Sequence, residues 1–108
     1  MSYQPNGLSQ DTLNTIKNII QEQLGSLKKY RIFFYGSRSR SDFKKYSDLD
    51  LWIEVNSLNQ EKDLIASVSE ALLESDIPIK VDIITPKSVL KEYLPSIKND
   101  LKLWFEKL

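Results

Sequence analysis

Hydrophobic residues recur at helical spacing in two long segments of the chain. The first begins at Ser9, a residue suited to cap a helix, and ends near Gly25, which suits a helix end. Its apolar positions, three or four residues apart, are Leu13, Ile16, Ile20, Leu24 and Leu27. The second follows the capping residue Asn59, ends before Ile77 and Pro78, and carries Leu64, Ile65, Val68, Leu72 and Leu73. We therefore predict one helix over residues 9–25 and another that begins near Asn59.

Three further segments have the patterns of β-strands. Residues 31–35 are, after Arg31, a continuous run of β-branched and aromatic side chains, which favours a strand covered on both faces. Residues 48–55 alternate with a period of two, so that one face is apolar and Asp48 and Asp50 lie on the other. Residues 79–85 form a third, mostly apolar run. The sequence therefore predicts three strands.

The C-terminal part combines prolines placed for helix starts with an apolar stripe at helical spacing. Pro86 and Pro95 each fit the first turn of a helix. The stripe of the last predicted helix consists of Ile97, Leu101, Trp104, Phe105 and Leu108. With a short helical loop after the first strand, these elements predict one α/β (α+β) domain over residues 1–108. We expect a small mixed three-stranded sheet with helices packed mainly on one face.

The composition limits the available chemistry. The chain of 108 residues contains no cysteine and no histidine. This excludes disulfides, thiolate zinc sites, histidine metal ligands and Ser-His-Asp triads, so catalysis must use carboxylates, hydroxyl groups, lysine or arginine. The sequence has neither an apolar run long enough to cross a membrane nor a signal-peptide pattern at its start. We therefore expect a cytoplasmic protein.

Acidic and basic residues balance, with 15 of each. A net charge of zero argues against stable nucleic-acid binding, which relies on a cationic surplus. Seven basic residues nevertheless fall between positions 28 and 45, against one acid: Lys28, Lys29, Arg31, Arg38, Arg40, Lys44 and Lys45. Such a cluster suits a small polyanion such as a nucleoside triphosphate, although a solvated charged loop is the simpler alternative.

Two short patterns indicate a site for phosphate chemistry. Gly36 and Ser37 follow the first predicted strand, where backbone N–H groups can hold a phosphate, although a plain turn would explain the same pair. Asp48 and Asp50 share a strand face, about 6 to 7 Å apart at the backbone. Asp82 interrupts an apolar strand, where an acid is rarely placed for folding. Because like charges this close repel unless a cation is present, three carboxylates on two strands predict a metal site.

The spacing between these patterns resembles that of a known family. Gly36-Ser37, ten further residues and Asp48-Leu49-Asp50 reproduce the GSx10DxD signature of the DNA polymerase β-like nucleotidyltransferase superfamily. Within that superfamily the chain is similar to the minimal nucleotidyltransferases (MNT) of MNT/HEPN toxin-antitoxin modules. The wider segments that carry this similarity are residues 34–38, 45–51 and 81–84.

The resemblance implies a site for ATP and two Mg2+ ions, which are the usual equipment of in-line nucleotidyl transfer. Asp48 and Asp50 would ligate the metals, while Asp82 would complete the site and help to deprotonate the acceptor hydroxyl group. Gly36 and Ser37 would hold the β and γ phosphates.

The resemblance also gives roles to two arginines in the segment after Ser37. Arg40 lies where relatives often have a phosphate-binding arginine. Arg38 belongs to a common Gly-Ser-Arg variant and would either bind the nucleotide or anchor the loop.

The family further implies a partner, an all-helical HEPN ribonuclease. The nucleotidyltransferase acts as its antitoxin by attaching AMP from ATP to a tyrosine hydroxyl group. Chain length favours a partner independently, because 108 residues leave little material for the second wall of an acceptor pocket. Trp104 and Phe105 would then form either a docking surface or plain core. The sequence leaves open whether the chain is also a homo-oligomer.

Two other functions are compatible with the same residues. In the first, the protein is a non-catalytic antitoxin that binds metal and nucleotide and neutralises its partner sterically. In the second, it transfers a nucleotide to a small hydroxyl compound such as an aminoglycoside, a reaction that normally requires an additional acceptor domain. A catalytic variant that still neutralises the partner would favour the steric function.

Overall fold

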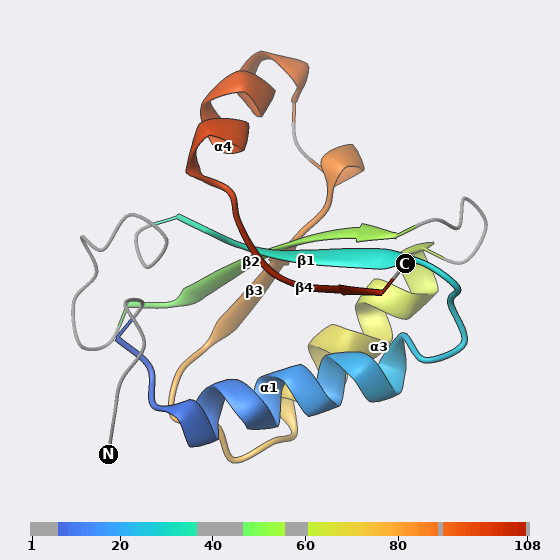
Figure 1. The fold of residues 1–108 in the computed structure, drawn as a ribbon, viewed down its shortest axis with the longest axis vertical. Helices are drawn as coiled ribbons and strands as arrows, with labels where there is room; N and C mark the ends of the chain where they lie inside the picture. The colour runs from blue at the N-terminus through green and yellow to red at the C-terminus, as the bar shows by residue number, and fades with distance from the viewer. Residues whose placement is uncertain (1–6, 37–46, 56–60, 89, 108) are drawn as a thin grey trace.

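The computed structural model describes residues 7–36, 47–55, 61–88 and 90–107 (Figure 1). The long helices are α1 (Gln10–Gln23) and α3 (Glu61–Leu73), and a shorter helix is α4 (Leu94–Asp100). The strands are β1 (Tyr30–Tyr35), β2 (Leu49–Val55), β3 (Val81–Ile84) and β4 (Lys102–Lys107). Two short 3-10 helices, η1 (Pro86–Ser88) and η2 (Lys91–Tyr93), connect β3 to α4.

The strands form one mixed sheet in the order β3-β2-β1-β4. β1 is antiparallel to both of its neighbours, β2 and β4, whereas β2 and β3 run parallel. The long helices α1 and α3 lie together on one side of the sheet, and α4 lies on the other side (Figure 1). The mixed sheet and the main helical layer on one face confirm the predicted α+β architecture.

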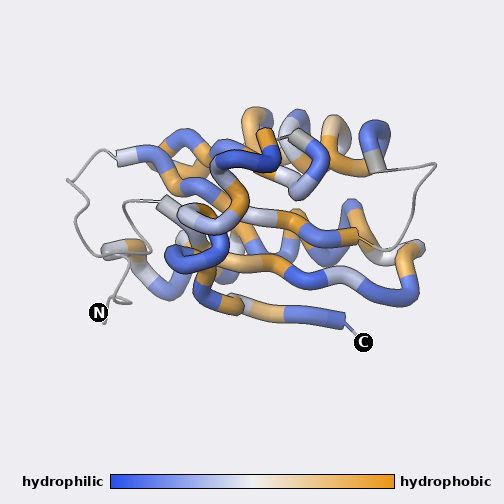
Figure 2. Tube along the Cα trace, turned by 90° about the horizontal axis from the view of Figure 1, so that it is seen from above, coloured by the Kyte–Doolittle hydropathy of each residue, from blue (hydrophilic) through white to orange (hydrophobic). Residues whose placement is uncertain are grey.

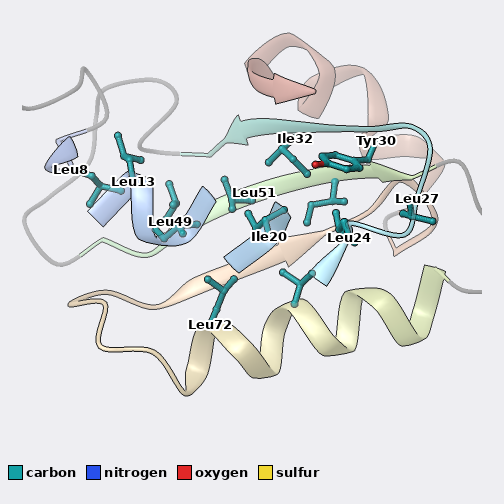
Figure 3. Packing of buried hydrophobic residues seen from close by; sticks show 13 residues of the cluster. Leu8, Leu13, Ile20, Leu24, Leu27, Tyr30, Ile32, Leu49, Leu51 and Leu72 are labelled. Atoms are coloured by element: carbon teal, nitrogen blue, oxygen red, sulfur yellow. The ribbon is translucent and has the colours of Figure 1, made fainter. Parts of the chain in front are cut away.

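The main core lies between the sheet and the helices α1 and α3, where apolar side chains from both layers meet (Figure 3). Helix α1 forms as its pattern predicts, with the Ser9 hydroxyl accepting a hydrogen bond of 3.2 Å from the backbone N–H of Thr12. Its residues Ile16 and Ile20 are fully buried. Burial of a side chain of this size stabilises the fold by about 1.5 to 3 kcal/mol.

The opposite face of the sheet carries a second, smaller buried region. Trp52 is fully buried, although it alternates along β2 with Leu51 and Ile53, which point into the main core. The indole N–H of Trp52 donates a hydrogen bond of 2.9 Å to Glu54, which also forms a 2.7 Å ion pair with Arg31 of β1. Helix α4 packs against β1 and η1 against β2, so this face is also partly covered.

The C-terminal segment differs from the sequence prediction. The last helix ends at Asp100, and the residues after Leu101 form β4, so the sheet has four strands and not three. The reason is contact with β1, because the ring of Trp104 stacks on Phe34 with a centroid distance of 4.8 Å. Aromatic side chains favour strands when such cross-strand partners are available. Of the apolar stripe predicted for the last helix, Ile97 therefore lies in α4 and Trp104 and Phe105 lie in β4, while Leu108 lies outside the described residues.

A β-bulge in β4 brings two consecutive aromatic rings to the same side of the sheet. Ile32 pairs with Phe105, but the next residue of β1, Phe33, pairs with Leu103, so Trp104 is the extra residue. The rings of Trp104 and Phe105 lie 5.0 Å apart, and the ammonium group of Lys17 in α1 lies 5.2 Å from the Phe105 centroid. Both rings therefore pack on the α1 side of the sheet against the main core, where they are partly buried.

β4 forms one edge of the sheet. In Figure 2 it runs along the border of the molecule and ends in hydrophilic residues. In the ranges that the structure covers, no helix is both long enough and apolar enough to cross a membrane.

Candidate active site

Two aspartates occupy paired positions on neighbouring strands. Asp50 of β2 is the register partner of Asp82 in β3 and, on its other side, of Tyr35 at the end of β1. Residues that pair across strands share a face of the sheet. This face is the one that carries α4, because Leu49 and Leu51, on either side of Asp50, are fully buried in the core under α1 and α3. The fold therefore brings Asp50 and Asp82 together, as the strand patterns predict.

Gly36 links this pair of carboxylates to the end of β1. Its φ angle is +80°, a left-handed conformation that glycine adopts without strain. A Cβ atom at this position would collide with the Asp50 carboxylate and would lie 3.2 Å from its Cγ. Only glycine allows the end of β1 to approach Asp50 this closely. The two halves of the GSx10DxD pattern thus meet in space at Gly36 and Asp50.

Asp48 lies directly before β2 and is exposed. The backbone N–H of the following residue, Leu49, donates a hydrogen bond of 2.9 Å to the carbonyl of Lys80, so the pairing with the β3 segment continues to this end of the strand. By alternation, Asp48 belongs to the same face as Asp50. The three predicted carboxylates therefore occupy one end of one face of the sheet.

Lys80 also belongs to this site, although the sequence analysis did not select it. Its ammonium nitrogen lies 3.5 Å from Oδ1 of Asp82. Both side chains are partly open to solvent, with exposed fractions of 64% for Lys80 and 41% for Asp82. The alternation along residues 79–85 places position 80 on the same face as Asp82, and this is the signal that could have identified the lysine.

The carboxylates do not form a preassembled metal cage. Within the described ranges, no three His, Cys, Asp or Glu side chains are grouped closely enough to hold a metal ion. The donor chemistry still fits a hard divalent cation, because Asp50 and Asp82 offer carboxylate oxygens from paired positions and Asp48 offers another one nearby. The close approach of Gly36 to the Asp50 carboxylate places the start of the Gly-Ser turn beside these donors. Mg2+ therefore fits the residues that are present.

Three of the predicted site residues, Ser37, Arg38 and Arg40, lie outside the described residues. Their roles in binding the nucleotide stay predictions. The position of Gly36 indicates only that this segment leaves β1 next to Asp50.

Comparison with known proteins identifies relatives over nearly the whole chain. The profile of the nucleotidyltransferase domain family matches residues 13–104. A Methanocaldococcus jannaschii protein provisionally named as a protein adenylyltransferase is 36% identical over 100 residues, which cover 83% of this chain and 95% of the relative. MntA of Haemophilus influenzae, which is also provisionally named as a protein adenylyltransferase, is 34% identical over 95 residues. The match covers 85% of this chain and 77% of the relative.

Proposed function

Because the chain belongs to the nucleotidyltransferase domain family, we propose that this nucleotidyltransferase transfers AMP from ATP to a hydroxyl group of a partner protein. The observation that carries the proposal is the meeting of Gly36 with Asp50, in register with Asp82. A glycine turn of the kind that binds phosphate thus lies next to carboxylates of the kind that bind a divalent cation. The names of the two relatives support protein as the acceptor class.

The mechanism assigns a distinct task to each residue of the site. Asp48, Asp50 and Asp82 would hold Mg2+, as two ions, which neutralises charge on the triphosphate when bound. The turn at Gly36 would offer backbone N–H groups to a phosphate beside Asp50, and Ser37 would supply a hydroxyl donor to it. Arg40, with Arg38 as a second candidate, would bind the remaining phosphate charge.

The reaction exchanges one phosphorus–oxygen bond for another. The acceptor oxygen bonds to the α phosphorus, the bond from the α phosphorus to the bridging oxygen of the β phosphate breaks, and pyrophosphate leaves. The proton of the acceptor hydroxyl passes to the carboxylate of Asp82, which is 41% exposed and therefore accessible to an incoming group. Asp82 thus has a second task as proton acceptor.

We propose that the acceptor is a tyrosine of a HEPN toxin and that the protein is its cytoplasmic antitoxin. The site lies at one end of the sheet face that carries α4, and its carboxylate Asp82 and neighbouring Lys80 are both partly exposed. A tyrosine of a second protein could reach such a face without entering a deep pocket. The partner would then supply the second wall of the acceptor site.

The direct test mixes the protein with the proposed HEPN partner, Mg2+ and ATP labelled at the α phosphate. We expect label on the partner with the wild type and little label with Asp48→Asn or Asp50→Asn. Asp63→Asn, the same change at an exposed position of α3, is the matched control. Size-exclusion chromatography should show the same complex with every variant.

The possible results distinguish the proposed enzyme from a steric antitoxin and from a small-molecule transferase. Label transfer at the wild-type rate by both site variants would refute the catalytic assignment. If wild type and variants all neutralise the toxin without transferring label, the protein is a steric antitoxin. Label that goes only to an added aminoglycoside would indicate a small-molecule transferase.

A further inference from the structure

Lys80 places a positive charge inside the carboxylate site. Its ammonium nitrogen lies 3.5 Å from Oδ1 of Asp82, and Asp82 in turn pairs in register with Asp50. The backbone carbonyl of Lys80 accepts a hydrogen bond from Leu49, the residue between Asp48 and Asp50. Lys80 therefore stands at the strand end that carries the three aspartates.

A lysine at this strand end offsets the negative charge of the neighbouring aspartates. Like charges at paired positions repel each other and disfavour the folded state when no cation is present. Asp50 and Asp82 occupy such positions. A neighbouring ammonium group reduces this repulsion. The same ammonium group engages an oxygen that a divalent cation would need, so Lys80 and the cation compete for Asp82.

We propose that Lys80 is a built-in counter-ion that holds Asp82 in the metal-free protein and releases it when a divalent cation binds. The inference rests on the proposed function, because it takes Asp82 as a ligand of the cation. Lys80 is thus a positioning residue that acts through Asp82 and lowers the cation affinity of the free protein.

The exposure of the pair makes such an exchange easy. With exposed fractions of 64% and 41%, Lys80 and Asp82 form a weak ion pair that breaks at small cost. The flexible stem of lysine lets the ammonium group move away without any movement of the backbone. We therefore expect Lys80 to weaken cation binding only modestly, by about two- to tenfold.

The test measures binding of Mn2+ to the full chain without nucleotide, by electron paramagnetic resonance of the free ion. We expect Lys80→Gln to bind Mn2+ about two- to tenfold more tightly than the wild type. Lys80→Arg keeps the charge and should stay close to the wild type. Lys62→Gln removes the same charge from an exposed position on α3, on the other side of the sheet, and should change nothing.

Thermal unfolding supplies a second readout that does not depend on activity. In EDTA, Lys80→Gln should melt at or below the wild-type temperature, because the repulsion between Asp50 and Asp82 is no longer reduced. Added Mn2+ should raise its melting temperature more than that of the wild type. The double variant Lys80→Gln, Asp82→Asn should lose this additional gain.

The results distinguish failure of this inference from failure of the proposed function. If the wild type binds Mn2+ and Lys80→Gln binds it equally or more weakly, the counter-ion role is refuted while the cation site stands. If neither protein binds Mn2+, both the cation site and the role of Lys80 are refuted.

Discussion

The carboxylate of Asp50 lies so close to the α carbon of Gly36 that a Cβ atom there would collide with it. This contact joins the end of β1 to the start of β2, two strands that are separated along the chain by residues 36–48. It makes the glycine a steric requirement of the site as well as a conformational one, since its φ angle is +80°.

Gly36→Ala should therefore damage activity far more than stability. The left-handed conformation costs a non-glycine residue about 1 to 2 kcal/mol, and the collision would in addition displace the Asp50 carboxylate. Urea unfolding and transfer of labelled AMP would measure the two effects. Gly7→Ala, at the other glycine with a φ of 80°, is the control, and it should lose a similar stability but no activity. Full activity of Gly36→Ala would contradict the steric requirement.

Divalent cations should raise the melting temperature of the wild type but not that of the carboxylate variants. Asp50→Asn and Asp82→Asn are nearly isosteric and remove like-charge repulsion, so their metal-free stability should equal or slightly exceed that of the wild type. Differential scanning fluorimetry with EDTA, Mg2+, and Mg2+ with ATP would test this, with Asp63→Asn as a control that should behave as the wild type. If no cation changes the melting temperature of the wild type, the proposed metal site is refuted.

Trp104→Ala should destabilise the fold by about 2 to 3 kcal/mol, because it removes a ring stacked on Phe34. The neighbouring residue Leu103 is 51% exposed, so Leu103→Ala should cost less than about 1 kcal/mol. Urea unfolding followed by circular dichroism would compare the two variants. Equal losses of stability in the two variants would contradict a stabilising role of the ring stacking between β4 and β1.

Stability should decline at alkaline pH through Tyr30. Burial raises the pKa of the Tyr30 phenol above its ordinary value of 10.0, and the side chain is only 6% exposed. A pKa raised by folding means that the folded chain retains the proton longer than the unfolded chain does. This contribution is complete below the unfolded pKa and is lost as pH rises through the folded pKa.

Urea unfolding of the wild type and of Tyr30→Phe between about pH 9 and 11 would measure this loss, because phenylalanine has no proton to lose. The wild type should lose up to about 1.4 kcal/mol per pH unit relative to Tyr30→Phe within this window, and nothing below it. Tyr93→Phe, at an exposed ring, should follow the wild type. Parallel curves for wild type and Tyr30→Phe would contradict the role of Tyr30 burial.

The elements that could be predicted are those whose signals are local. The Ser9 cap and the apolar spacing of the first segment predict α1, and Ser9 does accept the expected hydrogen bond from Thr12. The alternation around Asp50 predicts its face in β2, and the apolar run around Asp82 predicts β3. Parallel pairing then brings the two acids together.

The features that could not be predicted depend on contacts between distant segments. Trp104 and Phe105 fit a helical stripe and a strand equally well. Their ring contacts with Phe34 and Tyr30 of β1 favour the strand β4. The ion pair of Lys80 with Asp82 depends on side-chain positions, because the alternation gives only the shared face. Sequence spacing alone does not contain this information.

The extra residue Trp104 also affects how the protein meets other chains. A sheet edge offers unpaired backbone groups to any neighbouring strand, which makes long flat edges prone to aggregation. The bulge at Trp104 bends and twists β4, and exposed lysines, Lys102 and Lys107, stand at its two ends. A second strand would have to pair with an edge that is twisted and that carries a lysine at each end. We therefore expect the irregularity that packs both aromatic rings against the core also to disfavour the addition of a second strand at this edge.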